Sequence, residues 1–404
     1  MKIVFLVNHF PVGGVSTGGA GNYVANMASI MQRFGHDVTV ITEAEKSEVV
    51  YWNEIEIRRI RATRGFRDTG RPMRTYKKFL KNIWRSVWYN WEVYKISRKE
   101  KIDIVQSSST YGIPILRIKK VPYVVRVSEY HPLWSGARKL EYDFKTCLKS
   151  HHIDEEIIFL GFKRADRIVV PSYLMKDLIY RKVRKESIVV ESPVVMDGGD
   201  ALSLQERELT ENKYWVTYSA MNYRKEIHIL AKIIDDLLDA YPDMKYVMIG
   251  RDSEVFYEGN FMKTSDFFDM HIKKNKNRFL FMGEISDRKR LFSIVKNSYA
   301  CILPTRVDNL PNTCLEAMAL GKIVVSSTCV YGTSVEQLIT DGDNGFLAQV
   351  DDMADLYNKI VCAMQLSPEE KRVMEERAKD RVKGLTPEKI YKEMMKIYSK
   401  VLTQ

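Results

Sequence analysis

The sequence predicts an α/β protein with two domains, each built around a doubly wound parallel sheet. Its 404 residues exceed the roughly 100–200 residues of an ordinary domain, so two hydrophobic cores are expected. Hydrophobic residues make up 45% of the chain and aromatic residues 11%, which is enough apolar material to fill both cores. Short apolar runs typical of buried strands alternate with helical segments along the chain, and this alternation is typical of parallel α/β sheets.

The first domain is expected over residues 1–195. A buried strand, KIVFLV, leads into TGGAGNYVANMASIMQRFG, a glycine-rich turn that opens a helix, and then into a second strand, HDVTVIT. This order is the right-handed parallel unit from which doubly wound sheets are built. Further strands are predicted at IDIVQSS, PYVVRVS and RIVVPS.

The second domain is expected over residues 196–385. Its series of strands begins after a polar and acidic stretch at 197–212. Its predicted strands are YWVTYSA, KYVMIG, RFLFMG, YACILP and KIVVSS. The last segment, 386–404, has apolar residues at helical spacing and is assigned to the first domain as a terminal helix. We therefore expect two Rossmann-like domains facing each other across a cleft, with ligands at the carboxyl edges of the sheets.

Composition limits the compartment and the partners. The five cysteines are scattered and show no C-x-x-C spacing, which favours a reducing compartment and gives no metal or redox motif. No run of about 18 apolar residues occurs, so a cytoplasmic, soluble or peripheral protein is expected. The net charge of +11 calls for anionic partners. Nucleic acid is disfavoured because no recognised binding motif accompanies the charge.

The most specific segment is CILPTRVDNLPNTCLEAMALGKIVVSSTCVYGTSVEQLITDGDNGF at 301–346. A buried strand ends at Pro304, and a helix is predicted to begin near Pro311 with Asn309 as its cap. Free amide groups at such a helix start suit a diphosphate. Glu316, about one turn into the helix, can accept hydrogen bonds from ribose hydroxyls, and Asp308 can meet a sugar ring.

This segment resembles the family 4 glycosyltransferases of the GT-B fold, known as glycosyl transferases group 1. Their motif is an acidic residue, seven residues, Glu, and then A-M-A-x-G-x-P-V-V. Asp308 and Glu316 match the two acids, and 317–325 reads AMALGKIVV, so Asp replaces the usual Glu and Ile323 the usual Pro. The resemblance implies donor-binding residues along the helix start, at Asn309, Leu310, Pro311, Asn312, Thr313 and Glu316.

Other parts of the resemblance concern the donor phosphates. Gly18 and Gly19 match the family's glycine-rich first loop, although a tight turn needed only for packing would give the same letters. The usual Gly-Arg and following Lys-Gly of the second domain correspond to SAMNYRKE, which keeps Lys225 but has Ala220 in place of Arg. Nearby Arg224 or Arg251 could supply the missing charge, and solvated side chains are the alternative for each.

The first domain shows one further departure. Family members often carry a His where Ser128 ends the strand PYVVRVS, and His131 lies three residues later. A loop His beside Glu129 and Arg126 could take over contacts to the transferred sugar, but a lone His is as often only a surface or core residue. We name His131, Lys225 and Asp308 as the candidate catalytic residues.

The resemblance implies a hexosyltransferase that retains the anomeric configuration and uses a nucleoside diphosphate sugar, by default a UDP-sugar. No metal or other cofactor is expected. The expected acceptor is a glycan or a polyprenyl-diphosphate-linked sugar in cell-surface polysaccharide biosynthesis. Two alternatives remain: a nucleotide-sugar epimerase, and a catalytically silent GT-B subunit that binds nucleotide sugar, which Ala220 and Ser128 favour.

The positive charge is concentrated in one region. From Arg58 to Lys101 there are fifteen Lys or Arg residues against three acids. Within it, TYKKFLKNIWRSVWYNWEVYKISRK reads as a helix with Ile83, Trp84, Val87, Trp88, Trp91 and Tyr94 on one face, flanked by Lys77, Lys78, Lys81, Arg85 and Lys95. Such a face predicts docking on an anionic membrane, and the alternative is packing against the first sheet with a solvated basic rim.

Overall fold

The computed structural model describes residues 1–12, 18–61, 75–136, 153–196, 202–328 and 332–403. It divides the chain into two compact units. The first contains Met1–Pro132, Lys149–Val195 and Leu385–Gln404, and the second contains Leu133–Leu148 and Met196–Gly384. Residues Leu133–Leu148 thus group with the second unit, whereas the sequence analysis placed them in the first domain. Each unit is a parallel α/β fold, which confirms the predicted fold class.

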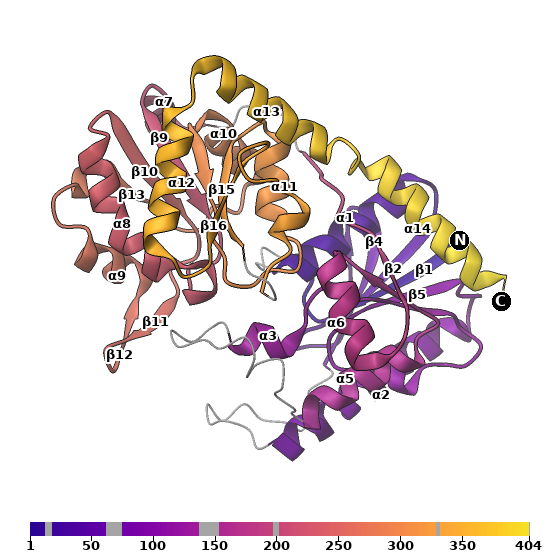
Figure 1. Ribbon diagram of the computed structural model, residues 1–404. Coiled ribbons are helices and arrows are strands. Elements are labelled where there is room, and N and C mark those ends of the chain that lie inside the picture. The colour runs from indigo at the N-terminus through magenta and orange to yellow at the C-terminus, as the bar shows by residue number, and fades with distance from the viewer. Residues whose placement is uncertain (13–17, 62–74, 137–152, 197–201, 329–331, 404) are drawn as a thin grey trace. The chain divides into compact units, whose positions relative to one another are not determined.

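The first unit has an eight-stranded sheet in the order β3-β4-β2-β1-β5-β6-β7-β8 (Figure 1). Neighbouring strands are parallel except for the antiparallel pair β3 and β4 at one edge. The strands are β1 Lys2–Val7, β2 Asp37–Glu43, β3 Glu48–Trp52, β4 Ile55–Ile60, β5 Ile104–Ser108, β6 Tyr123–Arg126, β7 Arg167–Val170 and β8 Ser187–Val189.

Helices connect these strands, as a parallel sheet requires. They are α1 Gly19–Arg33, α2 Thr75–Ser97, η1 Ile113–Leu116, α5 Ile153–Arg164 and α6 Tyr173–Val183. Helix α3, His131–Gly136, begins in this unit, and its residues from Leu133 on group with the second unit. Gly112, at φ 64°, lies so close to α5 that a Cβ atom there would meet the Ile157 carbonyl oxygen at 2.3 Å. Only glycine fits this contact between η1 and α5.

The C-terminal helix α14, Pro387–Leu402, belongs to the first unit and lies along α1 (Figure 1). The ring of Tyr391 stacks on Phe34 with centroids 3.9 Å apart. Buried Tyr398 donates a hydrogen bond to the Gln106 side chain of β5. These contacts seat the last helix on the same unit as the first strand.

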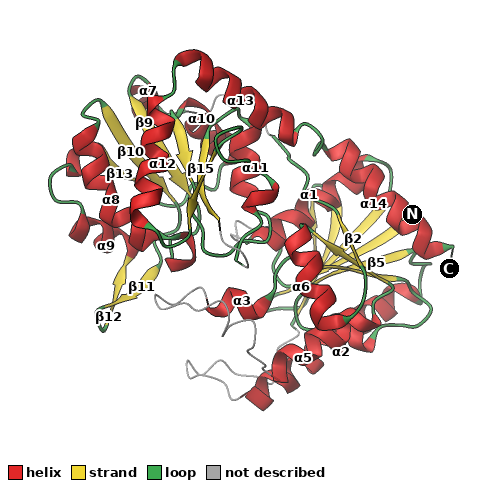
Figure 2. Ribbon diagram, viewed as in Figure 1, coloured by secondary structure: helices red, strands yellow, loops and turns green. Residues whose placement is uncertain are grey.

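The second unit has a fully parallel six-stranded sheet in the order β13-β10-β9-β14-β15-β16. Its strands are β9 Lys213–Tyr218, β10 Met244–Ile249, β13 Phe279–Phe281, β14 Ala300–Ile302, β15 Val324–Thr328 and β16 Phe346–Gln349. A separate hairpin consists of β11 Glu254–Tyr257 and β12 Asn260–Lys263. Figure 2 shows the strands with helices on both sides of the sheet.

The helical segments of this unit cover its core. They are α7 Leu204–Thr210, η2 Tyr223–Lys225, α8 Ile227–Ala240, α9 Thr264–His271, η3 Lys276–Arg278, α10 Arg288–Asn297, α11 Asn312–Ala319, η4 Val335–Gln337, α12 Met353–Gln365 and α13 Pro368–Val382. Trp215 of β9 is fully buried at the centre of the hydrophobic cluster. Within the described ranges, no helix of either unit combines the length and apolar content that a bilayer span needs.

Candidate functional site

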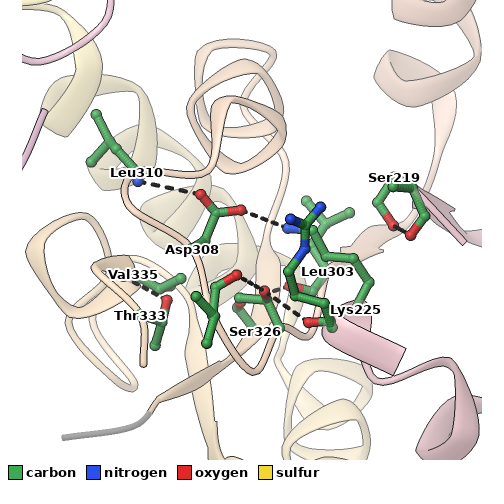
Figure 3. A network of polar contacts seen from close by, with 12 residues as sticks. Ser219, Lys225, Leu303, Asp308, Leu310, Ser326, Thr333 and Val335 are labelled. Atoms are coloured by element: carbon green, nitrogen blue, oxygen red, sulfur yellow. Dashed lines mark hydrogen bonds and ion pairs between the residues drawn. The ribbon is translucent and has the colours of Figure 1, made fainter. Parts of the chain in front are cut away.

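The second unit brings Lys225 and Asp308 together at the carboxyl edge of its sheet (Figure 3). Lys225 follows β9 and Asp308 follows β14, and these two strands are parallel neighbours. Parallel neighbours end at the same edge, so their following loops meet there. The Lys225 ammonium donates to the Asp308 carboxylate over 2.7 Å, and both side chains are mostly buried, at 11% and 14% exposed. The solvated lysine considered in the sequence analysis is therefore not what the fold shows.

Asp308 is held firmly in place. Its backbone N–H donates to the Gly332 carbonyl over 2.9 Å, and its carbonyl accepts from the Ser334 N–H over 3.0 Å. The second carboxylate oxygen accepts from the Leu310 N–H over 3.3 Å (Figure 3). The carboxylate thus links the lysine to the segment that leads into α11.

Helix α11 begins one residue later than predicted, and its cap differs. Pro311 is the N-cap residue and offers no side-chain cap, whereas Asn309, the expected cap, is buried two residues earlier. The Cys314 and Leu315 N–H groups donate to the Pro311 carbonyl. The amides of Asn312 and Thr313 have no hydrogen-bond partner among the described residues. Such unsatisfied N–H groups at a helix start favour an anion.

Glu316 lies one turn into α11 and forms an ion pair with Arg288, the first residue of α10. Glu316 is 14% exposed and Arg288 is 41% exposed. Burial raises the pKa of Glu316, and the Arg288 guanidinium opposes that shift. The sequence analysis missed Arg288, whose only signal is a basic RKR run after the cap Asp287.

The two arginines proposed to replace the missing cation have different surroundings. The Arg224 guanidinium lies over the Trp134 ring, 3.7 Å from its centroid. Arg251 is exposed and directly follows Gly250 at the carboxyl end of β10. Gly250 itself is required by close packing, because a Cβ atom there would lie 2.2 Å from the Ser219 carbonyl oxygen. Ala220, the residue in the family's Arg position, is exposed at the end of β9.

The candidate residues of the first unit form separate groups. Gly18 is the N-cap of α1 in an extended conformation, and a Cβ atom there would meet nothing within 4 Å. Gly19 begins the helix and is exposed. Neither backbone conformation nor packing among the described residues requires glycine at 18, which argues against the packing-only interpretation of that position.

His131 begins α3 and pairs with a different carboxylate from the one expected. Its Nδ1 lies 2.6 Å from a carboxylate oxygen of buried Glu155 in α5. A small pocket is lined by Ser109, Glu129, His131, Glu155, Ile158, Phe159 and Phe162. The expected neighbour Arg126 is instead buried, with its guanidinium 4.4 Å from the Tyr23 ring centroid. Burial lowers the Arg126 pKa. Ser128, at the family's His position, donates its backbone N–H to Ser109.

The fold and this edge define a class of protein. It is a two-unit parallel α/β protein with a lysine–aspartate ion pair, a glutamate–arginine ion pair and an open helix start at the edge of one sheet. Comparison with known sequences then identifies the family. Glycosyltransferase Family 4 matches residues 17–195, and Glycosyl transferases group 1 matches residues 202–381. Together these two matches cover most of the chain, and the chain belongs to the family 4 glycosyltransferases with the GT-B fold.

Individual relatives are distant. An uncharacterized glycosyltransferase of Haemophilus influenzae is 24% identical over 200 residues, covering 49% of this chain and 51% of its own length. One from Methanocaldococcus jannaschii is 21% identical over 259 residues, covering 60% of this chain and 59% of its own length. The chain thus matches little more than half the length of these curated relatives.

Solved structures share the fold over the whole chain. Sucrose-phosphate synthase from Thermosynechococcus elongatus has a TM-score of 0.75 at 14% identity and covers 100% of this chain and 99% of its own. Anabaena HepE, solved with UDP and glucose, has a TM-score of 0.67 at 16% identity, with 99% of each chain covered. Identities this low establish the fold alone.

Proposed function

We propose that this protein is a hexosyltransferase that moves a sugar from a nucleoside diphosphate sugar, by default a UDP-sugar, to an acceptor hydroxyl with retention of configuration. The carrying observation is the meeting of Lys225, Asp308 and the open start of α11 at one sheet edge. The family membership supports it, as do the UDP and the glucose with which the structural neighbour HepE was solved.

The geometry suits the charge changes of such a transfer. When the anomeric C–O bond breaks, negative charge grows on the leaving diphosphate, and preorganised cations and amides stabilise it. Lys225 and the Asn312 and Thr313 amides would meet the diphosphate. Asp308 holds Lys225 in position and would orient the sugar. Glu316 would anchor the ribose. The proposal assigns charge neutralisation to protein groups and requires no metal.

A panel of nucleotide sugars tests donor use directly. A ligand at 100 times its dissociation constant adds about 2.7 kcal/mol of stability, which a thermal unfolding experiment detects. We expect one nucleoside diphosphate sugar, with a UDP-sugar first in the panel, to stabilise the protein and to be consumed when an acceptor is present. A panel in which no nucleotide sugar raises the melting temperature would refute the proposal.

The proposed acceptor is a glycan or polyprenyl-diphosphate-linked sugar at an anionic membrane, in cell-surface polysaccharide synthesis on the cytoplasmic face. Helix α2 supports this part. Six large apolar residues are exposed at spacings of three or four, which places them on one helical stripe. These are Tyr76, Leu80, Trp84, Val87, Trp91 and Tyr94, called here the α2 stripe.

The opposite face of α2 is the one that packs on the sheet. Tyr89, Val93 and Ile96 are buried in the core of the first unit, with Trp88 partly buried against them. Trp88 therefore belongs to the core side, contrary to the single broad face expected from the sequence. One face of α2 therefore packs on the sheet, as one alternative expected, and a second apolar face is exposed; docking of that face on a membrane is our proposal.

Positive charge accompanies the α2 stripe. Lys77 and Lys78 are exposed beside it and Lys81 is half-buried. Arg85 departs from the expected basic rim, because it pairs with Glu43 over 2.9 Å and stacks on Tyr111 at 3.8 Å. Part of the basic region, residues 62–74, lies outside the described residues. An exposed aromatic stripe with adjoining lysines matches the chemistry of an anionic bilayer surface.

A second candidate function, a silent nucleotide-sugar-binding subunit, is favoured by Ala220 and by Ser128 at the family's His position. An exposed alanine at the end of β9 provides no cation for a diphosphate. Such a subunit would be stabilised by a nucleotide sugar but would not consume it. The same panel, followed by measurement of released nucleoside diphosphate, separates the two functions.

A further inference from the structure

Glu226, directly after Lys225, is an unexpected residue for its position. It has φ 48° and ψ 31°, the left-handed region that disfavours side chains other than glycine. It is also only 1% exposed, although carboxylates are rarely buried unless they are paired. Two unfavourable conditions at one residue call for a compensating interaction.

The Glu226 carboxylate supplies that interaction. One oxygen accepts a hydrogen bond from the Ser327 hydroxyl of β15, and the other accepts from the Asp351 N–H over 2.6 Å. Ser327 and Asp351 belong to β15 and to the loop after β16, whereas Glu226 follows η2. The carboxylate thus links the turn that contains Lys225 to β15 and to the loop after β16.

A second set of contacts fastens the same turn to the segment that carries Asp308. The Arg224 carbonyl accepts from the Arg306 N–H over 2.9 Å, two residues before Asp308. The Arg306 side chain pairs with the Asp351 carboxylate over 2.6 Å. Glu226, Asp351 and Arg306 therefore form a network around the turn, in which Glu226 and Arg306 are buried.

We propose that Glu226 is a positioning residue whose ionised carboxylate aligns Lys225 for transfer, so that turnover rises with pH around neutrality. This inference rests on the proposed function. Both groups that contact the carboxylate donate hydrogen bonds, and an ionised carboxylate can accept both. A proton on the oxygen that faces Ser327 turns the hydroxyl from donor to acceptor and leaves the other oxygen to accept from the Asp351 N–H, but both hydrogen bonds then lose the carboxylate charge. Hydrogen bonds to an ionised acceptor are about twice as strong as neutral ones, so protonation weakens the hold on the turn.

The surroundings place this titration near neutral pH. The pKa of Glu226 is raised to about 7, chiefly by burial; the hydrogen bonds from Ser327 and Asp351 and the charge of Arg306 oppose this rise, and the Asp351 carboxylate adds to it. The remaining titratable group of the network, His228, lies 3.3 Å from the Asp351 carboxylate. Its pKa is lowered chiefly by burial, with Arg306 and Lys232 acting in the same direction and the Asp351 carboxylate opposing them.

Turnover of UDP-glucose, or of the nucleotide sugar of the panel that best stabilises the wild type, should rise through an apparent pKa near 7. Glu226→Gln should lower kcat at pH 8 by about tenfold with little change in donor KM and should abolish the pH step. Glycine suits a φ of 48°, so Glu226→Gly should also lower kcat and abolish the pH step. This variant replaces Glu226→Gln if the Gln variant does not fold. Glu206→Gln, equally buried in the same unit, should keep the step.

Glu226 is proposed to act through Lys225. In a protein that already carries Lys225→Ala, Glu226→Gln should therefore cause no further loss of turnover. An additive loss, or a pH step that survives Glu226→Gln, would overturn it. Carboxyl ¹³C NMR provides a readout without turnover: one Glu signal should titrate near pH 7 and vanish in Glu226→Gln. A Glu226 signal that titrates below pH 5 refutes this inference alone. An absence of nucleotide-sugar binding refutes the proposed function and leaves the NMR result standing.

Discussion

The Lys225 ammonium lies 2.7 Å from the Asp308 carboxylate, although 83 residues separate the two positions in the chain. The contact follows from the sheet order, since β9 and β14 are adjacent and parallel and both loops leave the same edge. Each partner balances the charge of the other. A mostly buried lysine held in this way is already ordered. Binding of an anion therefore does not include the entropy cost of ordering a flexible side chain.

Glu316→Ala should abolish donor binding and leave the fold intact. The carboxylate is proposed to bind ribose, and its partner Arg288 is 41% exposed, so water can solvate the arginine left behind. Calorimetric titration with the donor and thermal unfolding measure the two effects separately. Unchanged donor affinity in this variant would contradict the assignment.

Arg288→Ala should make donor affinity depend on pH. Without the guanidinium, burial raises the pKa of Glu316 unopposed, so the protonated form persists to higher pH. Protonated Glu316 should bind the donor more weakly than the ionised form does. Donor affinity should therefore be low at acidic pH and should recover as the pH rises. Donor dissociation constants at pH 5.5 and 8 test this, and equal losses at both values would show that Arg288 does not act through Glu316.

Arg251→Ala should lower turnover about as much as loss of Lys225 does, whereas Arg224→Ala should have a smaller effect. Arg251 is exposed at the carboxyl end of β10, next to β9, while the Arg224 guanidinium is held against Trp134. Steady-state kcat/KM for the three variants gives the comparison. A larger loss for Arg224 would identify that residue as the replacement for the missing family arginine.

The α2 stripe should bind anionic liposomes. Each basic residue near an anionic surface contributes about 1 kcal/mol, so Lys77, Lys78 and Lys81 together give measurable binding. Co-sedimentation should increase with anionic lipid and decrease with salt, because exposed charges are screened over roughly 8 Å at physiological ionic strength. Changing these three lysines to Glu should reduce binding and spare transfer to a soluble acceptor.

Matched variants separate charge from aromatic contact. Lys392, Lys396 and Lys400 are exposed on α14 of the same unit, and changing them to Glu alters net charge equally without touching α2. Trp84→Ser and Trp91→Ser should weaken liposome binding, whereas Trp88→Ser should destabilise the fold. If wild type does not sediment with anionic liposomes at low salt, the acceptor need not be membrane-bound.

Glu226 should make stability fall between about pH 4.5 and 7. Its pKa rises from the ordinary value of 4.5 to about 7 on folding, so the folded protein retains a proton that the unfolded chain has released. This contribution is fully present below pH 4.5 and is lost as pH rises through 7, a change of about 3 kcal/mol. Chemical denaturation of wild type and Glu226→Gln at pH 5 and 7.5 checks it. Equal pH dependence in both proteins would contradict the assignment.

The sequence predicted most strands of both sheets because parallel strands are continuous apolar runs bounded by glycine and polar residues. It missed the short edge strands β8 and β16, the pair β3 and β4, where IEIRRI alternates apolar and charged residues, and the short hairpin of β11 and β12. Edge and hairpin strands bury one face at most, so their apolar signal is weak.

Motif spacing named Asp308 and Glu316 as candidate site residues. It did not predict the ion pairs of Lys225 with Asp308 and of Arg288 with Glu316, because these depend on which elements are neighbours in the fold. Asn309 was expected to cap α11 from residue type alone, yet the loop buries it before the helix begins. Glu226 was passed over, since its role depends on a left-handed turn and on Ser327, 101 residues away.

Turnover of the Lys225→Ala variant tests the central claim most directly. Nucleoside diphosphate release from the stabilising nucleotide sugar, measured with acceptor present, should fall at least about tenfold relative to wild type, which corresponds to about 1.4 kcal/mol of lost transition-state stabilisation. Thermal unfolding of the same variant shows whether the protein remains folded. Full activity in a folded Lys225→Ala protein, or no release by the wild type with any donor that binds, would contradict the account.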